Sequence, residues 1–102
     1  MSRDGHTIDG PLGSIRIEGD ALLGLVIKAA ELVEGARVRR PRRGLDVSVS
    51  DGTAKVELEL AARYGAALPT VAREVQTNVA AALLRSAGLA AAVDVSIEEL
   101  DL

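Results

Sequence analysis

The fold of this chain is decided by residues 63–79, which read RYGAALPTVAREVQTNV. Gly65 allows the backbone to turn, and Pro69 suits the first turn of a helix, where its missing N–H is not needed. Valines then recur every fourth residue over 71–79 and mark one face of that helix. The segment therefore predicts a strand end, a turn and an amphipathic helix. We expect Tyr64, the only aromatic residue, to fill the junction with its ring.

Strands are predicted on both sides of this segment. Apolar and polar residues alternate over 45–50 and over 54–60, which is typical of strands with one buried face. The Asp-Gly dipeptide at 51–52 lies between them and favours a tight hairpin turn. Shorter alternating runs at 36–39 and 93–98 predict two more strands.

A first helix is predicted over residues 20–34, with Asp20 as its N-cap and Gly35 where the helix stops. Its apolar residues follow i, i+3, i+4, i+7 spacing and predict one buried stripe. The stripe consists of Leu22, Leu25, Val26, Ala29, Leu32 and Val33. Ile27 falls roughly opposite the stripe, so we expect it on the surface.

The second helix is predicted over residues 69–87, and Gly88 offers its C-terminal stop. Leu84 falls on the outer side of this helix. One exposed apolar residue on each helix, Ile27 and Leu84, makes both of them candidate protein contacts. Residues 1–13 show little periodicity and predict a flexible lead-in, after which 15–17 predict a short half-buried strand.

These elements predict a single domain over residues 14–102. The expected fold is α/β in the α+β sense, a two-layer sandwich in the order β-α-β-β-β-α-β. One mixed or antiparallel sheet has an apolar face, and two amphipathic helices cover that face. Periodicity does not decide between the mixed and the antiparallel sheet.

Composition excludes several classes of function. The chain has no Cys, which excludes disulfides and thiolate chemistry, and its single His, His6, lies in the predicted lead-in. No nucleophile–base pair and no metal-ligand spacing is evident, so we expect no catalytic residue, no metal and no cofactor. The chain shows neither an apolar leader nor a run of roughly 18 apolar residues. We therefore expect a non-enzymatic cytoplasmic protein without a membrane span.

The most distinctive charged feature is a cluster of five arginines in a predicted loop: Arg37, Arg39, Arg40, Arg42 and Arg43. Guanidinium groups suit phosphate and carboxylate oxygens, so this loop is a candidate contact for anionic lipid, RNA or an acidic partner. The alternative is a solvated loop. An acidic stretch near the C-terminus, residues 94–101, offers a complement, either within one molecule or between neighbours.

The 63–79 segment resembles the alkaline-shock-protein family of bacterial envelope-stress proteins. The matching residues are Tyr64, Gly65, Leu68, Pro69, Val71, Val75 and Gln76. Further landmarks in family order are 13–17, 33–36, 44–47, Asp-Gly at 51–52 and 88–89. The resemblance thus extends over most of the chain, although none of its landmarks is a catalytic motif.

The resemblance implies a non-enzymatic factor of the envelope stress response, cytoplasmic but held near the membrane. It also implies protein partners, including a small membrane anchor protein, and self-association into homo-oligomers. The alternative is a small RNA- or nucleic-acid-binding module that uses the loop at 37–43. A net charge of -3 and the single aromatic residue disfavour nucleic acid. A third reading, a small enzyme or ligand carrier, has no set of residues to support it.

Overall fold

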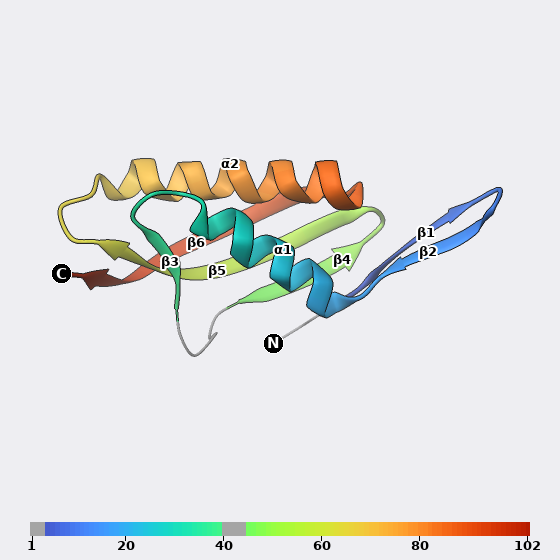
Figure 1. The fold of residues 1–102 in the computed structure, drawn as a ribbon, viewed down its shortest axis with the longest axis horizontal. Helices are drawn as coiled ribbons and strands as arrows, with labels where there is room; N and C mark the ends of the chain where they lie inside the picture. Colours follow the sequence, from blue (N-terminus) through green and yellow to red (C-terminus); the bar gives the residue numbers. More distant parts are fainter. Residues whose placement is uncertain (1–3, 40–44) are drawn as a thin grey trace.

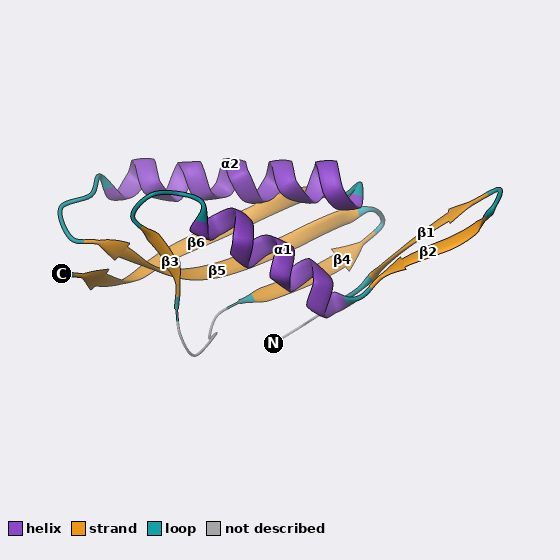
Figure 2. Ribbon diagram, in the orientation of Figure 1, coloured by secondary structure: helices purple, strands orange, loops and turns teal. Residues whose placement is uncertain are grey.

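The computed structural model describes residues 4–39 and 45–102. The elements in chain order are β1 (His6–Gly10), β2 (Gly13–Ile17), α1 (Gly19–Glu31), β3 (Ala36–Val38), β4 (Asp46–Ser50), β5 (Thr53–Arg63), α2 (Leu68–Ala87) and β6 (Ala90–Asp101). Both helices lie on the same face of the main sheet (Figure 1, Figure 2). The predicted α+β sandwich of two layers is confirmed.

The long strand β5 is the centre of a four-stranded mixed sheet. β6 runs parallel to β5 along its whole length, with α2 as the crossover that a parallel pair requires. On the other edge of β5, β4 pairs with the first half and β3 with the last three residues before Arg63, both antiparallel. A β-bulge between Leu60 and Ala61 inserts one extra residue into β6. The mixed sheet was one of the two predicted arrangements.

The β4–β5 hairpin and α2 form where the sequence predicts them. Asp51 and Gly52 both have positive φ, 52° and 73°, as a two-residue hairpin turn requires. α2 buries its valines against the sheet and ends at Gly88, which adopts the left-handed conformation of a helix C-cap. Gln76 joins this helix to β6, since its Nε2 donates to the Val93 carbonyl at 2.9 Å.

Side chains cover the outer edge of β3 and β4. The Asp4 N–H donates to the Val47 carbonyl at 3.3 Å, and the Asp4 carboxylate accepts from the Val49 N–H at 3.0 Å. The Val38 N–H donates to a Glu31 carboxylate oxygen at 3.0 Å. Strand edges with free backbone groups attract other strands, and these carboxylates occupy some of those groups.

The buried face of α1 differs from the prediction. Ile27 is only 7% exposed and belongs to the core, whereas Leu32 is 74% exposed. The buried residues are Gly19, Leu22, Leu23, Val26, Ile27, Ala29 and Ala30, with Val33 just beyond the helix. Relative to the predicted stripe, the centre of the buried face is rotated by roughly 70°. The helix also begins at Gly19 after an N-cap at Glu18, so Asp20 is not the cap.

The predicted lead-in contains a strand. β1 pairs with β2 in an antiparallel hairpin, a two-stranded sheet separate from the main one. The hairpin projects beyond the sandwich (blue in Figure 1). The strand expected over 15–17 is therefore β2, and because it projects in this way it is mostly exposed instead of half-buried; only Ile17, at its base, is partly buried against the core. The element order becomes β-β-α-β-β-β-α-β.

Tyr64 does not fill the junction before α2, because its side chain is 65% exposed. The backbone makes the junction instead: the Tyr64 N–H donates to the Asp101 carbonyl at 2.7 Å, and Gly65 has a φ of 88°. Pro69 stands in the first turn of α2, as predicted. The conformation of this segment thus depends on Gly65 and Pro69, with no contribution from a buried aromatic ring.

Candidate interaction surfaces

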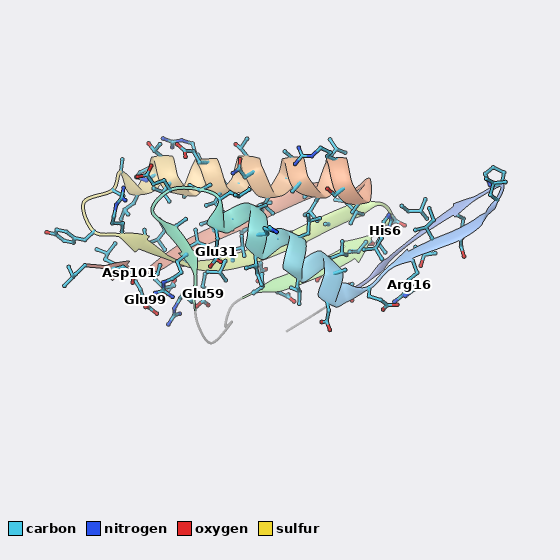
Figure 3. The ribbon with its side chains drawn as sticks, viewed as in Figure 1. His6, Arg16, Glu31, Glu59, Glu99 and Asp101 are labelled. Atoms are coloured by element: carbon cyan, nitrogen blue, oxygen red, sulfur yellow. The ribbon has the colours of Figure 1, made fainter. Side chains whose placement is uncertain are left out.

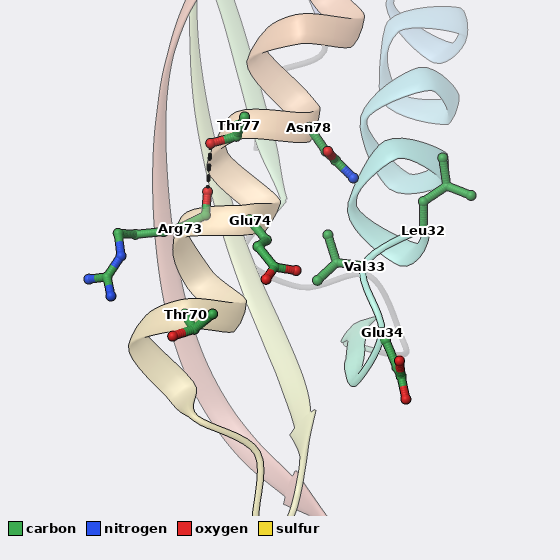
Figure 4. Close-up of a pocket in the computed structure, with 8 residues that line it drawn as sticks. All are labelled: Leu32, Val33, Glu34, Thr70, Arg73, Glu74, Thr77 and Asn78. Atoms are coloured by element: carbon green, nitrogen blue, oxygen red, sulfur yellow. Dashed lines mark hydrogen bonds between the residues drawn. The ribbon is translucent and has the colours of Figure 1, made fainter.

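A hollow of the described surface lies between α1 and α2, and we call it the interhelical groove. Its first part has a volume of about 530 Å³ and is lined by Leu32, Val33, Glu34, Thr70, Arg73, Glu74, Thr77 and Asn78 (Figure 4). Its second part has a volume of about 290 Å³ and is lined by Leu25, Lys28, Ala29, Leu32, Asn78, Ala81, Ala82 and Arg85. Leu32 and Asn78 belong to both parts, so the two hollows adjoin. The linings also show that the two helices run antiparallel.

The wall and floor of the second part are largely apolar. Leu25 and Leu32 come from α1 and its C-terminal end, and Ala81 and Ala82 from α2. Leu84, 61% exposed, follows Ala82 by two residues on α2. The Asn78 amide reaches the Ala29 carbonyl at 3.5 Å and links the two helices beneath the groove. Apolar side chains held open to solvent in this way are typical of a protein contact.

The two parts of the groove differ in charge, and Arg73 lines the first part beside two carboxylates. Lys28 and Arg85 line the second part, and neither has an ion-pair partner within residues 4–39 and 45–102. Glu34 and Glu74 line the first part. Glu34 forms an ion pair with Arg63 at 3.3 Å. The groove is therefore largely apolar with two bases in its second part, and it carries charges of both signs in its first part.

Two of the five clustered arginines are engaged within the molecule, by the carboxylates of Glu59, Glu99 and Asp101, which are labelled in Figure 3. Arg37 binds Asp101 in a bidentate pair, with Nε–Oδ2 and Nη2–Oδ1 distances of 3.1 and 3.0 Å. Arg39 binds Glu99 at 2.7 Å and also contacts Glu59. The acidic C-terminal strand thus meets the basic segment within one molecule.

These contacts shift the pKa values of the paired groups. The hydrogen bonds with Arg37 hold the pKa of the Asp101 carboxyl below its ordinary value of 3.8, against an opposing effect of desolvation. The pKa of Arg37 is raised by its hydrogen bond to Asp101, and that of Arg39 by its hydrogen bonds to Glu99 and Glu59. Arg40, Arg42 and Arg43 lie outside the described residues. As candidate contact residues, Arg37 and Arg39 are already occupied.

The Arg37–Asp101 pair predicts a pH dependence of stability. Because the pKa of Asp101 is lowered on folding, its contribution is complete above the ordinary carboxyl value and is lost as the pH falls through the lowered pKa. Asp101→Asn should lower the urea midpoint at pH 7, and the difference from the wild type should shrink as the pH falls through the lowered pKa of Asp101. Urea titrations of both proteins at a series of pH values measure this. A difference that persists unchanged in acid would mean that the carboxylate charge is not responsible.

Sequence reasoning missed Leu25, Leu32 and Lys28 as surface candidates. One signal could have indicated them. The apolar residues of α1 cover much more of the helix circumference than a single buried stripe, so some of them must be exposed. The sequence placed both Leu84 and Ile27 on the surface, and the structure buries Ile27. Of the family-motif residues, Val71 and Val75 are buried in the core.

Comparisons with known proteins identify the family. The sequence profile of the alkaline shock protein 23 family, described as having a cell envelope-related function, matches residues 12–102. Comparison with curated proteins and with solved structures gave no match. In the part of the chain that the structure describes, neither helix has the length and hydrophobicity to cross a bilayer, and no group of three or more His, Asp or Glu residues is placed to hold a metal ion. The match covers most of the chain and confirms the resemblance seen in the sequence: the protein belongs to the alkaline-shock-protein family, which has a cell envelope-related function.

Proposed function

We propose that this protein is a non-enzymatic, cytoplasmic component of the envelope stress response that acts through protein contacts near the membrane face, and that the interhelical groove is its main contact site. The single observation that carries the proposal is the apolar groove with Lys28 and Arg85 at one end. Leu32, at 74% exposure, is held open at the end of a helix whose leucines at 22 and 23 are buried. Partners in this proposal include a small membrane anchor protein and further copies of the chain.

The chemistry of the groove supports binding over catalysis. Its titratable residues are exposed, and the groove is a shallow hollow on the surface, not an enclosed pocket. Open grooves of this kind receive helices or extended segments of other proteins. Contact energy would concentrate at Leu25 and Leu32, with Lys28 and Arg85 setting the charge that a partner must carry.

The alternative function, nucleic-acid binding through the loop at 37–43, is weakened by the ion pairs of Arg37 and Arg39. Each guanidinium that already binds a carboxylate would have to exchange it for a phosphate. The outer face of the sheet beside them also carries the carboxylates of Glu57, Glu59 and Asp94, of which Glu59 pairs with Arg39 and Asp94 with Lys55. We therefore retain protein binding as the proposed function.

Site-specific photo-crosslinking in cells tests the groove. A photoreactive residue at position 32 should give a defined protein adduct that is recovered with the membrane fraction. The same residue at position 57, on the outer face of the sheet, serves as the matched control and should give no such adduct. Lys28→Glu combined with Arg85→Glu should reduce the adduct at position 32 by roughly tenfold or more. Equal adducts from positions 32 and 57 would contradict the proposal.

A further inference from the structure

The two edges of the main sheet differ in how far the protein covers them. On the β3–β4 edge, the carboxylates of Asp4 and Glu31 accept from strand N–H groups. The opposite edge is β6, a strand of 12 residues that within the described residues pairs with β5 alone. Gln76 reaches this edge from α2 and binds the Val93 carbonyl at 2.9 Å. A long strand edge with free backbone groups can pair with a strand of another molecule.

The backbone groups of β6 that face outward follow from the alternation of the strand. Val93 turns its carbonyl to Gln76 and away from β5. Residues at every second position share this direction, so Ala91, Val95 and Ile97 also turn their N–H and C=O groups outward. The β-bulge comes only after Ile97, so the row is regular up to that point. A strand laid along this edge would therefore find evenly spaced donors and acceptors.

The rim of this edge on the helix side is apolar and only partly covered. Val95 and Ile97 pack against the core but keep part of their surface exposed. Gln76 marks the side of α2 that lies beside β6, and its neighbours four residues away, Ala72 and Ala80, are small and half-buried. Small side chains at these positions leave room for those of an added strand. Such a strand would bury apolar residues at alternate positions against the rim.

The charge of β6 indicates which kind of strand fits. It carries four carboxylates and no base: Asp94, Glu98, Glu99 and Asp101. Three of them form ion pairs with Lys55, Arg37 or Arg39. Glu98 instead accepts from the Ser96 hydroxyl, and it has no basic partner within the described residues. Two β6 strands side by side would bring like charges together, which disfavours a second copy, whereas a strand with Lys or Arg complements the edge.

We propose that β6 is a docking edge for a basic, extended segment of another protein, which adds to the main sheet as a further strand. In this segment apolar residues alternate with Lys or Arg. The apolar side chains lie against Val95 and Ile97 beside α2, and the basic ones lie beside Asp94 and Glu98 on the outer face. Main-chain hydrogen bonds to residues 91–97 provide much of the affinity.

This edge is separate from the interhelical groove. α2 packs on β6, whereas α1 packs on β3 and β4, so α2 lies between the β6 edge and α1 (Figure 1, Figure 4). The inference therefore goes beyond the proposed function and does not depend on it.

NMR of the purified full chain with a short synthetic peptide tests the docking edge. The probe is a peptide in which Val alternates with Lys, and its control has Glu in place of Lys. The Lys peptide should shift the amide signals along β6 and slow hydrogen exchange at Ala91, Val95 and Ile97 by roughly tenfold or more. The Glu peptide should bind roughly tenfold more weakly. Without peptide, these three amides should exchange faster than those of Ala92 and Asp94, which face β5.

Methylation of the peptide's amide nitrogens separates strand addition from simple charge attraction. One peptide carries N-methyl groups on its Val residues and another on its Lys residues, so both keep their charge and each has one edge that cannot donate. With Val side chains toward α2, an antiparallel strand pairs through its Val amides and a parallel strand through its Lys amides. Only one of the two should therefore bind like the unmodified peptide, and its identity gives the direction of the added strand.

Two variants of the chain provide the matched test of charge. Glu98→Lys should weaken binding of the Lys peptide and strengthen binding of the Glu peptide, each by roughly threefold or more. Asp9→Lys makes the same change of charge on β1 and should affect neither. Both side chains are exposed, so circular dichroism should show an unchanged fold.

Three results would overturn the inference: no binding of the Lys peptide at millimolar concentration, equal binding of both methylated peptides, or shifted amides along the interhelical groove in place of β6. Protection of the β6 amides that grows with the concentration of the chain alone, without peptide, would assign this edge to a second copy and overturn it as well.

Discussion

Leu60→Ala is expected to lower the free energy of unfolding by about 2–5 kcal/mol, whereas Tyr64→Ala should lower it by less than about 1 kcal/mol. Leu60 has no exposed surface and lies in β5 at the point where β3 and β6 flank it. Removing its side chain leaves a cavity that the paired strands cannot close. Tyr64 lies four residues later on the same chain segment and presents its ring to solvent. Urea unfolding followed by circular dichroism measures both values.

The two variants control each other, because both remove a large side chain from the end of the same strand. The sequence predicts instead that the ring of Tyr64, the only aromatic residue, fills the junction between the strand end and α2. A loss of about 3 kcal/mol or more for Tyr64→Ala would restore that interpretation and place the ring in the core. A small loss instead makes Tyr64 available for contact with other molecules.

The local sequence was sufficient to predict those elements whose structure depends on a few neighbouring residues. The β4–β5 hairpin follows from alternation on both sides of Asp51 and Gly52, and α2 follows from Pro69, the valine spacing and Gly88. In each case the physical cause lies within a few residues: positive φ in the turn, fixed φ at the helix start and a left-handed C-cap. No distant contact was needed to choose between alternatives.

Sequence reasoning failed where the choice depended on distant partners. α1 is apolar around most of its circumference, so its pattern allows several buried faces, and the contacts with α2 and β3 select one of them. The Arg37–Asp101 pair joins residues 64 positions apart, and the sequence could not decide whether the basic and acidic segments meet within one molecule or between neighbours. The parallel pairing of β5 with β6 likewise depends on the whole crossover through α2.

The sequence did not predict the β1–β2 hairpin, for a different reason. Its first strand holds only Ile8 between polar neighbours, so it lacks the repeated alternation that predicts a strand. A turn at Pro11 and Leu12 between Gly10 and Gly13 was the available signal. A hairpin that does not contribute to the core leaves little hydrophobic pattern in the sequence.

Ile27 and Leu84 are both candidate surface contacts in the sequence, but the same substitution should affect them very differently. Ile27→Asp should destabilise the protein by roughly 3–5 kcal/mol, a large share of the roughly 5–15 kcal/mol that keeps a domain of this size folded, because an unpaired carboxylate would enter the core. Leu84→Asp should change the free energy of unfolding by no more than about 0.5 kcal/mol. The difference follows from exposure, 61% for Leu84 against 7% for Ile27.

Circular dichroism and urea unfolding of both variants provide the measurement, and Ile27→Val is the conservative control. That change removes one methyl group from the same site and should cost about 0.5–1.5 kcal/mol. An Ile27→Asp protein that loses no more stability than Leu84→Asp would place this face of α1 on the surface. The buried face would then be the predicted stripe with Leu25 and Leu32, and those residues would be in the core and unavailable to line a groove. The contact site between the helices therefore depends on which way α1 faces, and this pair of aspartate substitutions measures that directly.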